Sequence, residues 1–99
     1  MKPLNISEPA SAELAEAGRW YESRRPGWGA RLLTAVTAAM VLIESHPEIG
    51  SPRHGHRAAR QFRVRGFPYV LAYRIRPTDV YVVAVAHAKR RPGYWRHRS

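Results

Sequence analysis

The spacing of hydrophobic residues changes once along the chain, and this change constrains the fold more than any other feature. In the first half, apolar residues recur at helical spacing, as in Leu14, Ala17 and Tyr21. From about residue 61 the spacing becomes two, with Phe62 and Val64 alternating with arginines. Helices followed by a run of strands predict an α+β domain, in which a helical hairpin packs on one face of a mostly antiparallel sheet.

Capping and breaking residues set the bounds of the two predicted helices. Ser7 is a good N-cap, and the first helix should run from there to about Arg25. The sequence RPGWG at 25–29 combines proline with glycine and indicates a tight break. The second helix is expected over 29–45, because Pro47 ends it at or before the preceding residue. The short connection predicts an antiparallel pair.

Three aromatic residues lie near this break. Trp20 and Tyr21 extend the apolar stripe of the first helix, so we expect both of them in the core. Trp28 has two interpretations that the sequence leaves open, either a plug inside the turn or an exposed contact residue.

The remaining elements are short strands and their connections. Strands are predicted at 2–6, 61–65, 69–75 and 80–87, with a loop over 47–59, turns at 66–68 and 76–79, and a basic tail from 89. Pro3 favours an edge position for the first strand. The last strand is apolar on both faces and should be central and covered on both sides. Tyr94 and Trp95 are expected to fasten part of the tail to the body.

Length and composition limit the classes of protein to consider. Ninety-nine residues predict a single domain over 1–99. The chain has no cysteine, which excludes disulfides and thiolate metal sites. No stretch approaches the roughly 20 apolar residues of a membrane span, and the N-terminus does not resemble a secretory signal. We therefore expect a cytoplasmic protein.

Positive charge is concentrated in the second half of the chain. Residues 1–50 hold five basic and six acidic residues, whereas residues 51–99 hold twelve basic residues and one acidic residue, Asp79. The formal net charge is +10. Such asymmetry indicates that one surface meets a polyanion or an acidic partner, because solubility alone does not require it.

Four segments carry a resemblance to a known family. They are EAGRWYESRRPG at 16–27, IESHPEIG at 43–50, VRGFPYVLAYR at 64–74 and VAVAHAKRRPGYW at 83–95. In this order and at these spacings, they resemble the RelE/ParE superfamily of toxins from type II toxin–antitoxin systems, and the ParE-like plasmid-stabilisation proteins in particular. The resemblance implies a toxin neutralised by a cognate antitoxin, and the family's fold agrees with the α+β fold predicted above. We expect no cofactor.

The resemblance leaves two targets open. ParE-like members are associated with poisoning of DNA gyrase, and RelE-like members cleave messenger RNA on the ribosome. Aligning the strands carries the nuclease pattern onto four candidate catalytic residues, Arg63, Arg65, His87 and Tyr94. Two positions depart from the pattern, because Val70 and Ala88 cannot move protons or hold negative charge. These departures favour the ParE-like interpretation. A nucleic-acid-binding module without toxicity is a third, weaker possibility.

Basic and aromatic residues of the second half are candidates for binding a target or the antitoxin. The predicted binding set is Arg60, Arg63, Arg65, Lys89, Arg90, Arg91, Tyr94 and Trp95. Arginine and lysine bind phosphates or an acidic protein segment, and aromatic rings stack on bases. His54 and His56 form the only candidate metal pair, but arginines surround them, so we predict no metal site. The sequence does not determine whether the chain forms oligomers.

Overall fold

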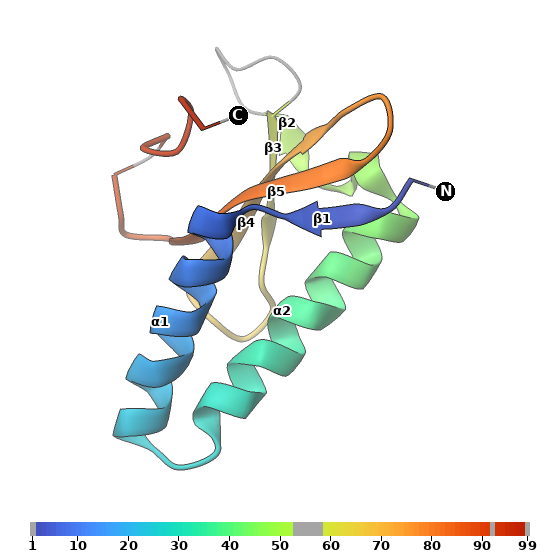
Figure 1. Ribbon diagram of the computed structural model, residues 1–99. Helices are drawn as coiled ribbons and strands as arrows, with labels where there is room; N and C mark the ends of the chain where they lie inside the picture. Colours follow the sequence, from blue (N-terminus) through green and yellow to red (C-terminus); the bar gives the residue numbers. More distant parts are fainter. Residues whose placement is uncertain (1, 53–58, 92, 99) are drawn as a thin grey trace.

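The computed structural model describes residues 2–52, 59–91 and 93–98. Its elements are β1 (Leu4–Ile6), α1 (Glu8–Arg24), α2 (Trp28–Ser45), a 3₁₀ turn η1 (Pro47–Ile49), β2 (Ser51–Pro52), β3 (Ala59–Arg63), β4 (Tyr69–Ile75) and β5 (Val80–His87). The two helices form a hairpin beside the sheet, and the C-terminal tail returns along β5 (Figure 1). The predicted α+β architecture is confirmed.

Local capping explains where the helices begin. The Ser7 hydroxyl accepts a hydrogen bond from the Ala10 N–H at 3.2 Å, as its position at the start of α1 predicts. Gly27 precedes α2 with φ of 91°, a conformation that favours glycine. The Glu22 carboxylate accepts from the N–H groups of Gly27 and Gly29, each at 3.0 Å. These contacts satisfy backbone donors at the start of α2 that would otherwise have no partner.

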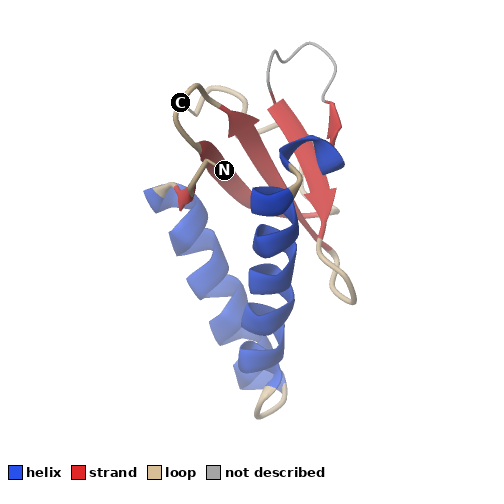
Figure 2. Cartoon of the chain, turned by 90° about the vertical axis from the view of Figure 1, so that its right-hand side faces the viewer, coloured by secondary structure: helices blue, strands red, loops and turns tan. Residues whose placement is uncertain are grey.

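The sheet has the strand order β1-β5-β4-β3-β2. β1 is parallel to β5, and the other neighbours are antiparallel. Figure 2 shows the helical hairpin and the strands of the sheet from the side. The predicted edge position of the first strand is therefore confirmed. The segment expected to be a loop over 47–59 contains η1 and β2, and β3 begins at Ala59, two residues earlier than predicted. These elements were missed because β2 has only two residues, too few for a period to show.

An irregularity in β5 determines which residues face each side of the sheet. Ala72 pairs with Ala84, but Tyr73 pairs with Val82, so Val83 is an extra residue in β5. Val82 and Val85 consequently belong to the helix-side core, whereas Val83 and Ala84 belong to the opposite face.

Two hydrophobic clusters cover β5 from both sides. The larger lies between the helices and the sheet and includes Leu32, Val36 and Ile43 of α2. The smaller lies on the opposite face, where the tail residue Trp95 packs on alanines and Val83. The prediction of a central, doubly covered last strand is confirmed.

Part of the helical hairpin leaves apolar side chains exposed. Leu33, Val41 and Leu42 of α2 are 44–56% exposed. By length and composition α2 could also cross a membrane, which the sequence analysis did not anticipate. In this fold its other face packs in the core. Trp20 was expected in the core and is 52% exposed, which corrects that prediction, while Tyr21 packs against the core as expected.

Candidate functional site

The carboxylate of Glu13 on α1 holds the C-terminal tail. One oxygen accepts hydrogen bonds from the Val85 N–H of β5 and from the Arg98 guanidinium, each at 3.0 Å. The other accepts from the Tyr94 hydroxyl at 2.6 Å and lies 3.6 Å from the Arg90 guanidinium. The Glu13 side chain is only 15% exposed. One carboxylate therefore connects helix, sheet and tail, which are distant in the sequence.

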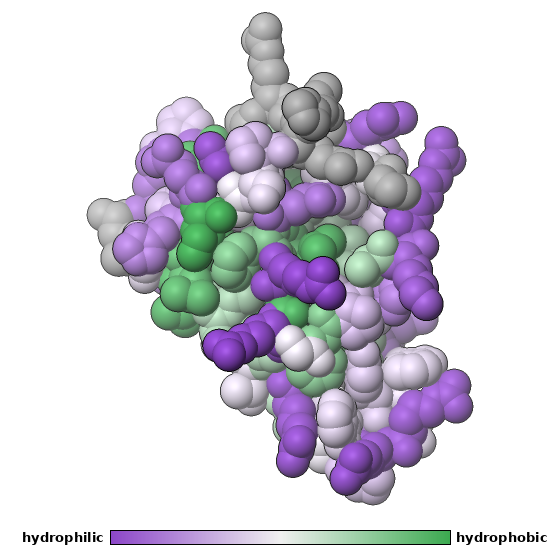
Figure 3. Space-filling model, turned by 180° about the vertical axis from the view of Figure 1, so that it is seen from behind, coloured by the Kyte–Doolittle hydropathy of each residue, from purple (hydrophilic) through white to green (hydrophobic). Residues whose placement is uncertain are grey.

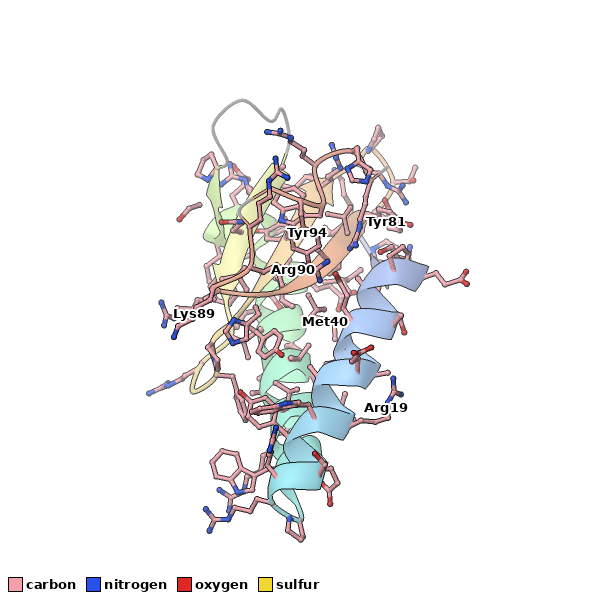
Figure 4. All side chains as sticks on the ribbon, turned by 90° about the vertical axis from the view of Figure 1, so that its left-hand side faces the viewer. Arg19, Met40, Tyr81, Lys89, Arg90 and Tyr94 are labelled. Atoms are coloured by element: carbon pink, nitrogen blue, oxygen red, sulfur yellow. The ribbon has the colours of Figure 1, made fainter. Side chains whose placement is uncertain are left out.

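Tyr94 is embedded among charged groups. The Arg90 guanidinium lies 3.9 Å from the centre of its ring, and the Arg98 guanidinium lies 5.1 Å away. Figure 4 shows Arg90 and Tyr94 side by side against the sheet, with Lys89 apart from them at the end of β5. Burial, followed by the hydrogen bond to Glu13, raises the pKa of Tyr94 to about 12. The hydroxyl is therefore a bound hydrogen-bond donor at neutral pH.

His87 is held at the end of β5. Its Nδ1 accepts a hydrogen bond from the Lys89 N–H at 3.0 Å, and its ring meets the Tyr69 ring edge-on at 5.2 Å. Because Nδ1 is an acceptor, the neutral ring carries its proton on Nε2. His87 and Tyr94 line a common hollow of about 170 Å³ with Arg90 and Arg91, so two of the four candidate catalytic residues come together.

The other two candidate catalytic residues, Arg63 and Arg65, do not line that hollow. Both are exposed, whereas Val64 between them is fully buried, so the predicted strand phase is correct. Within the described ranges neither side chain has a hydrogen-bond or ion-pair partner. They are available for a partner of opposite charge.

The remaining members of the predicted binding set differ in availability. Arg60 donates to the backbone oxygens of Glu48 and Gly50 at 3.1 and 2.7 Å, so much of its hydrogen-bonding capacity is used. Lys89 and Arg91 are exposed. Trp95 is 1% exposed, which corrects its assignment as a contact residue. The indole fills the space above the small side chains of Ala72 and Ala84.

A cleft of about 570 Å³ opens between α1 and the adjacent end of the sheet. Its aromatic wall includes Trp20, Tyr21 and Tyr69, and its polar groups include Glu16 and His87. Trp28 stacks on Tyr21 with ring centres 6.5 Å apart and meets Phe67 edge-on, so it packs between the helical hairpin and the turn before β4. Burial is the main cause that raises the pKa of Tyr69, and the nearby Tyr21 and Glu16 add to it.

Glu13 is the central residue that sequence reasoning missed. It occupies a polar position of an amphipathic helix, where carboxylates are ordinarily solvated. The basic residues that it binds lie more than 70 positions away, so no local pattern indicated the contact.

The histidine pair considered as a candidate metal site, His54 and His56, lies outside the described residues. Among the residues that the structure describes, no group of three His, Cys, Asp or Glu side chains could hold a metal ion.

Comparisons with known proteins agree with this fold. The family model for the ParE toxin of type II toxin–antitoxin systems, parDE, matches residues 4–92. A chain of the chromosomal ParDE toxin–antitoxin system from P. aeruginosa superimposes with a TM-score of 0.79 at 13% identity, covering 90% of this chain and 98% of that one. No curated protein matches the chain. With a family model spanning nearly all of the described fold, the chain belongs to the ParE toxin family of type II toxin–antitoxin systems.

Proposed function

We propose that this chain stops bacterial growth by binding DNA gyrase in the cytoplasm, as a non-enzymatic inhibitor. Membership of the ParE family implies a cognate antitoxin that neutralises it. We prefer binding over RNA cleavage because of the contacts made by the residues that align with the catalytic positions of RelE-like nucleases. Cleavage of RNA needs side chains that exchange protons at one phosphate.

Those residues do not converge as proton-exchanging groups on one place. The Tyr94 hydroxyl donates to Glu13 and its pKa is raised to about 12, so it is bound to that carboxylate and not free to act on a substrate. A guanidinium is a poor general base, and Arg63 and Arg65 lie apart from the hollow that His87 and Tyr94 share. These features support a surface that binds rather than one that cleaves.

The exposed cations and the apolar helix surface suit protein partners. Arg63, Arg65, Lys89 and Arg91 present positive charge from one half of the chain. Seen from behind, the molecule shows an apolar area bordered by hydrophilic side chains (Figure 3). A segment of the antitoxin that carries acidic and apolar residues would complement both features and block the working surface.

Two assays on the purified chain separate the alternatives. The first follows plasmid supercoiling by gyrase, and the second follows the length of messenger RNA during cell-free translation. Loss of supercoiling with intact messages is the expected result. Cleaved messages with unaffected supercoiling would instead establish a ribonuclease and overturn the proposal.

A charge variant tests which surface binds the target. Arg63→Ala with Arg65→Ala should reduce inhibition of gyrase while the circular dichroism spectrum is retained, because both side chains point away from the core. Arg19→Ala with Arg31→Ala is the matched control, since it removes the same charge from exposed positions of the two helices. Equal inhibition by both double variants would show that the basic strand surface is not the contact.

A further inference from the structure

We propose that the cleft between α1 and the sheet is a binding site for the base of a guanine nucleotide. This inference does not rest on the proposed function. It rests on the walls of the cleft, on the polar groups inside it that lack partners, and on the cations at its rim. Its volume, about 570 Å³, falls in the range of sites for small ligands.

The walls of the cleft suit a flat aromatic ligand. Trp20, Tyr69 and Pro68 line it, and Trp20 is 52% exposed, which is unusual for so large an apolar side chain. Trp20 is fixed by an edge-on contact with Tyr21, with ring centres 5.0 Å apart, and the Arg24 guanidinium lies over its ring, 4.8 Å from the ring centre. A stacking base would occupy the opposite face of the indole. Aromatic rings in a groove bind bases by stacking, at about 1–3 kcal/mol per base.

The polar groups inside the cleft have unused hydrogen-bonding capacity. Within residues 2–52, 59–91 and 93–98, the Glu16 carboxylate and the hydroxyls of Tyr21 and Tyr69 make no hydrogen bond. Glu16 and Tyr21 are nevertheless close enough to Tyr69 to raise the pKa of its hydroxyl. Glu16 is exposed and the two tyrosines are half-buried, so all three groups can exchange bound water for the polar edge of a ligand.

The carboxylate selects among the bases. The Watson–Crick edge of guanine presents two adjacent donors, N1–H and N2–H, which match the two oxygens of a carboxylate such as Glu16. Adenine offers one donor beside an acceptor nitrogen, which a carboxylate repels. His87 lines the same cleft, and its Nε2–H is free to donate to a guanine acceptor because Nδ1 already binds the Lys89 N–H.

The rim of the cleft suits a phosphate. Arg90 lines the cleft, and its side chain is 56% exposed although it contacts Glu13 and Tyr94. Lys89 precedes it and is exposed. An aromatic wall with a carboxylate could also bind a cationic side chain. The net charge of +10 disfavours such a cation and favours an anionic nucleotide.

Titration of the purified chain with GMP, followed by tryptophan fluorescence, tests the site. We expect saturable binding of GMP, weaker binding of IMP, which lacks the N2 amino group, and still weaker binding of AMP. Glu16→Gln should weaken GMP binding and reduce its preference over AMP. Trp20→Ala should weaken binding of GMP at least about fivefold in calorimetry, because it removes a stacking surface.

A control variant outside the cleft and a competing cationic ligand test the specificity of the cleft. Glu8→Gln changes an exposed carboxyl at the start of α1, outside the cleft, and should bind GMP like the unchanged chain. Unchanged melting temperatures would show that the variants fold. No saturable GMP binding at millimolar concentrations, equal affinity for AMP, or an unaffected Glu16→Gln variant would overturn the proposal, as would saturable binding of arginine amide instead.

A short single-stranded oligouridylate with one central guanine identifies the source of the base. Tighter binding than free GMP would indicate guanine within a strand, and affinity equal to that of GMP would indicate a free nucleotide. Equal affinity for an oligouridylate without guanine would mean that the basic surface binds only phosphates, which contradicts the proposal.

Discussion

Replacement of Glu13 by alanine should release the tail and destabilise the whole fold. The carboxylate accepts three hydrogen bonds from the tail, two from the Arg98 guanidinium and one from the Tyr94 hydroxyl, and one from the backbone of β5. Its removal leaves the Val85 N–H without this partner and leaves the Arg98 guanidinium, 21% exposed, without its carboxylate.

The size of this effect follows from the contacts. Breaking a buried ion pair by removing one partner costs about 3–5 kcal/mol, and a hydrogen bond to a charged group contributes about 1.5–3 kcal/mol. Because the Glu13 side chain is still 15% exposed, we expect the free energy of unfolding to fall by an amount at the lower end of this range, about 3 kcal/mol. For a domain of this size, that loss lowers the melting temperature by roughly 15 °C.

Two measurements read the result. Calorimetry gives the melting temperature, and limited trypsin digestion reports exposure of the tail, which contains Arg96 and Arg98 after the buried Trp95. Glu13→Ala should melt earlier and lose the tail faster. Glu16→Ala, one turn along the same helix, removes an equal charge that has no partner in the described ranges and should change neither value. Equal melting of both variants, with equal resistance of the tail, would refute the role of Glu13.

Three further outcomes are expected. Gly29→Ala should lower the melting temperature, because a Cβ there would lie 2.8 Å from the Gly18 backbone oxygen. Gly18→Ala, whose Cβ meets nothing within 4 Å, should stabilise α1 by about 0.5–1 kcal/mol. A higher melting temperature for Gly29→Ala than for Gly18→Ala would refute the close contact between the helices. Because the pKa of Tyr94 is raised, the stability that its protonated hydroxyl adds is complete below about pH 10 and is lost as the pH rises through about 12. The stability of Tyr94→Phe should therefore fall less steeply in that pH window. Superimposable alkaline denaturation curves of the two proteins would contradict the bond between Tyr94 and Glu13. Hydrogen bonds from Arg76 and Asn5 lower the pKa of Asp79 to about 2. The stability that its carboxylate adds is therefore present above about pH 4 and is lost as the pH falls through about 2. In urea titrations, the stability difference between the unchanged chain and Asp79→Asn should shrink over that range.

Local patterns along the chain were enough to predict both helices, the two longest strands and the family. Helical spacing, the Ser7 cap and the break at 25–29 predict both helices to within one residue at their ends. Alternation predicts β4 and β5 over their full observed lengths. These features are local, because each depends on residues within a few positions of one another. The four ordered segments carried the resemblance to the ParE-like toxins for the same reason, since motifs are read directly from the chain.

Which side chains meet in the site depends on how distant parts of the chain pack together. The extra residue Val83 in β5 shifts the facing of its neighbours, and no period in the sequence announces it. Trp95 was assigned to the binding surface and is a core residue, whereas Trp20 was expected in the core and is exposed in the cleft. The contact between Glu13 and Tyr94 spans 81 positions. Such contacts depend on how the tail folds back over the sheet, and periodicity within one element carries no information about the element that will lie against it.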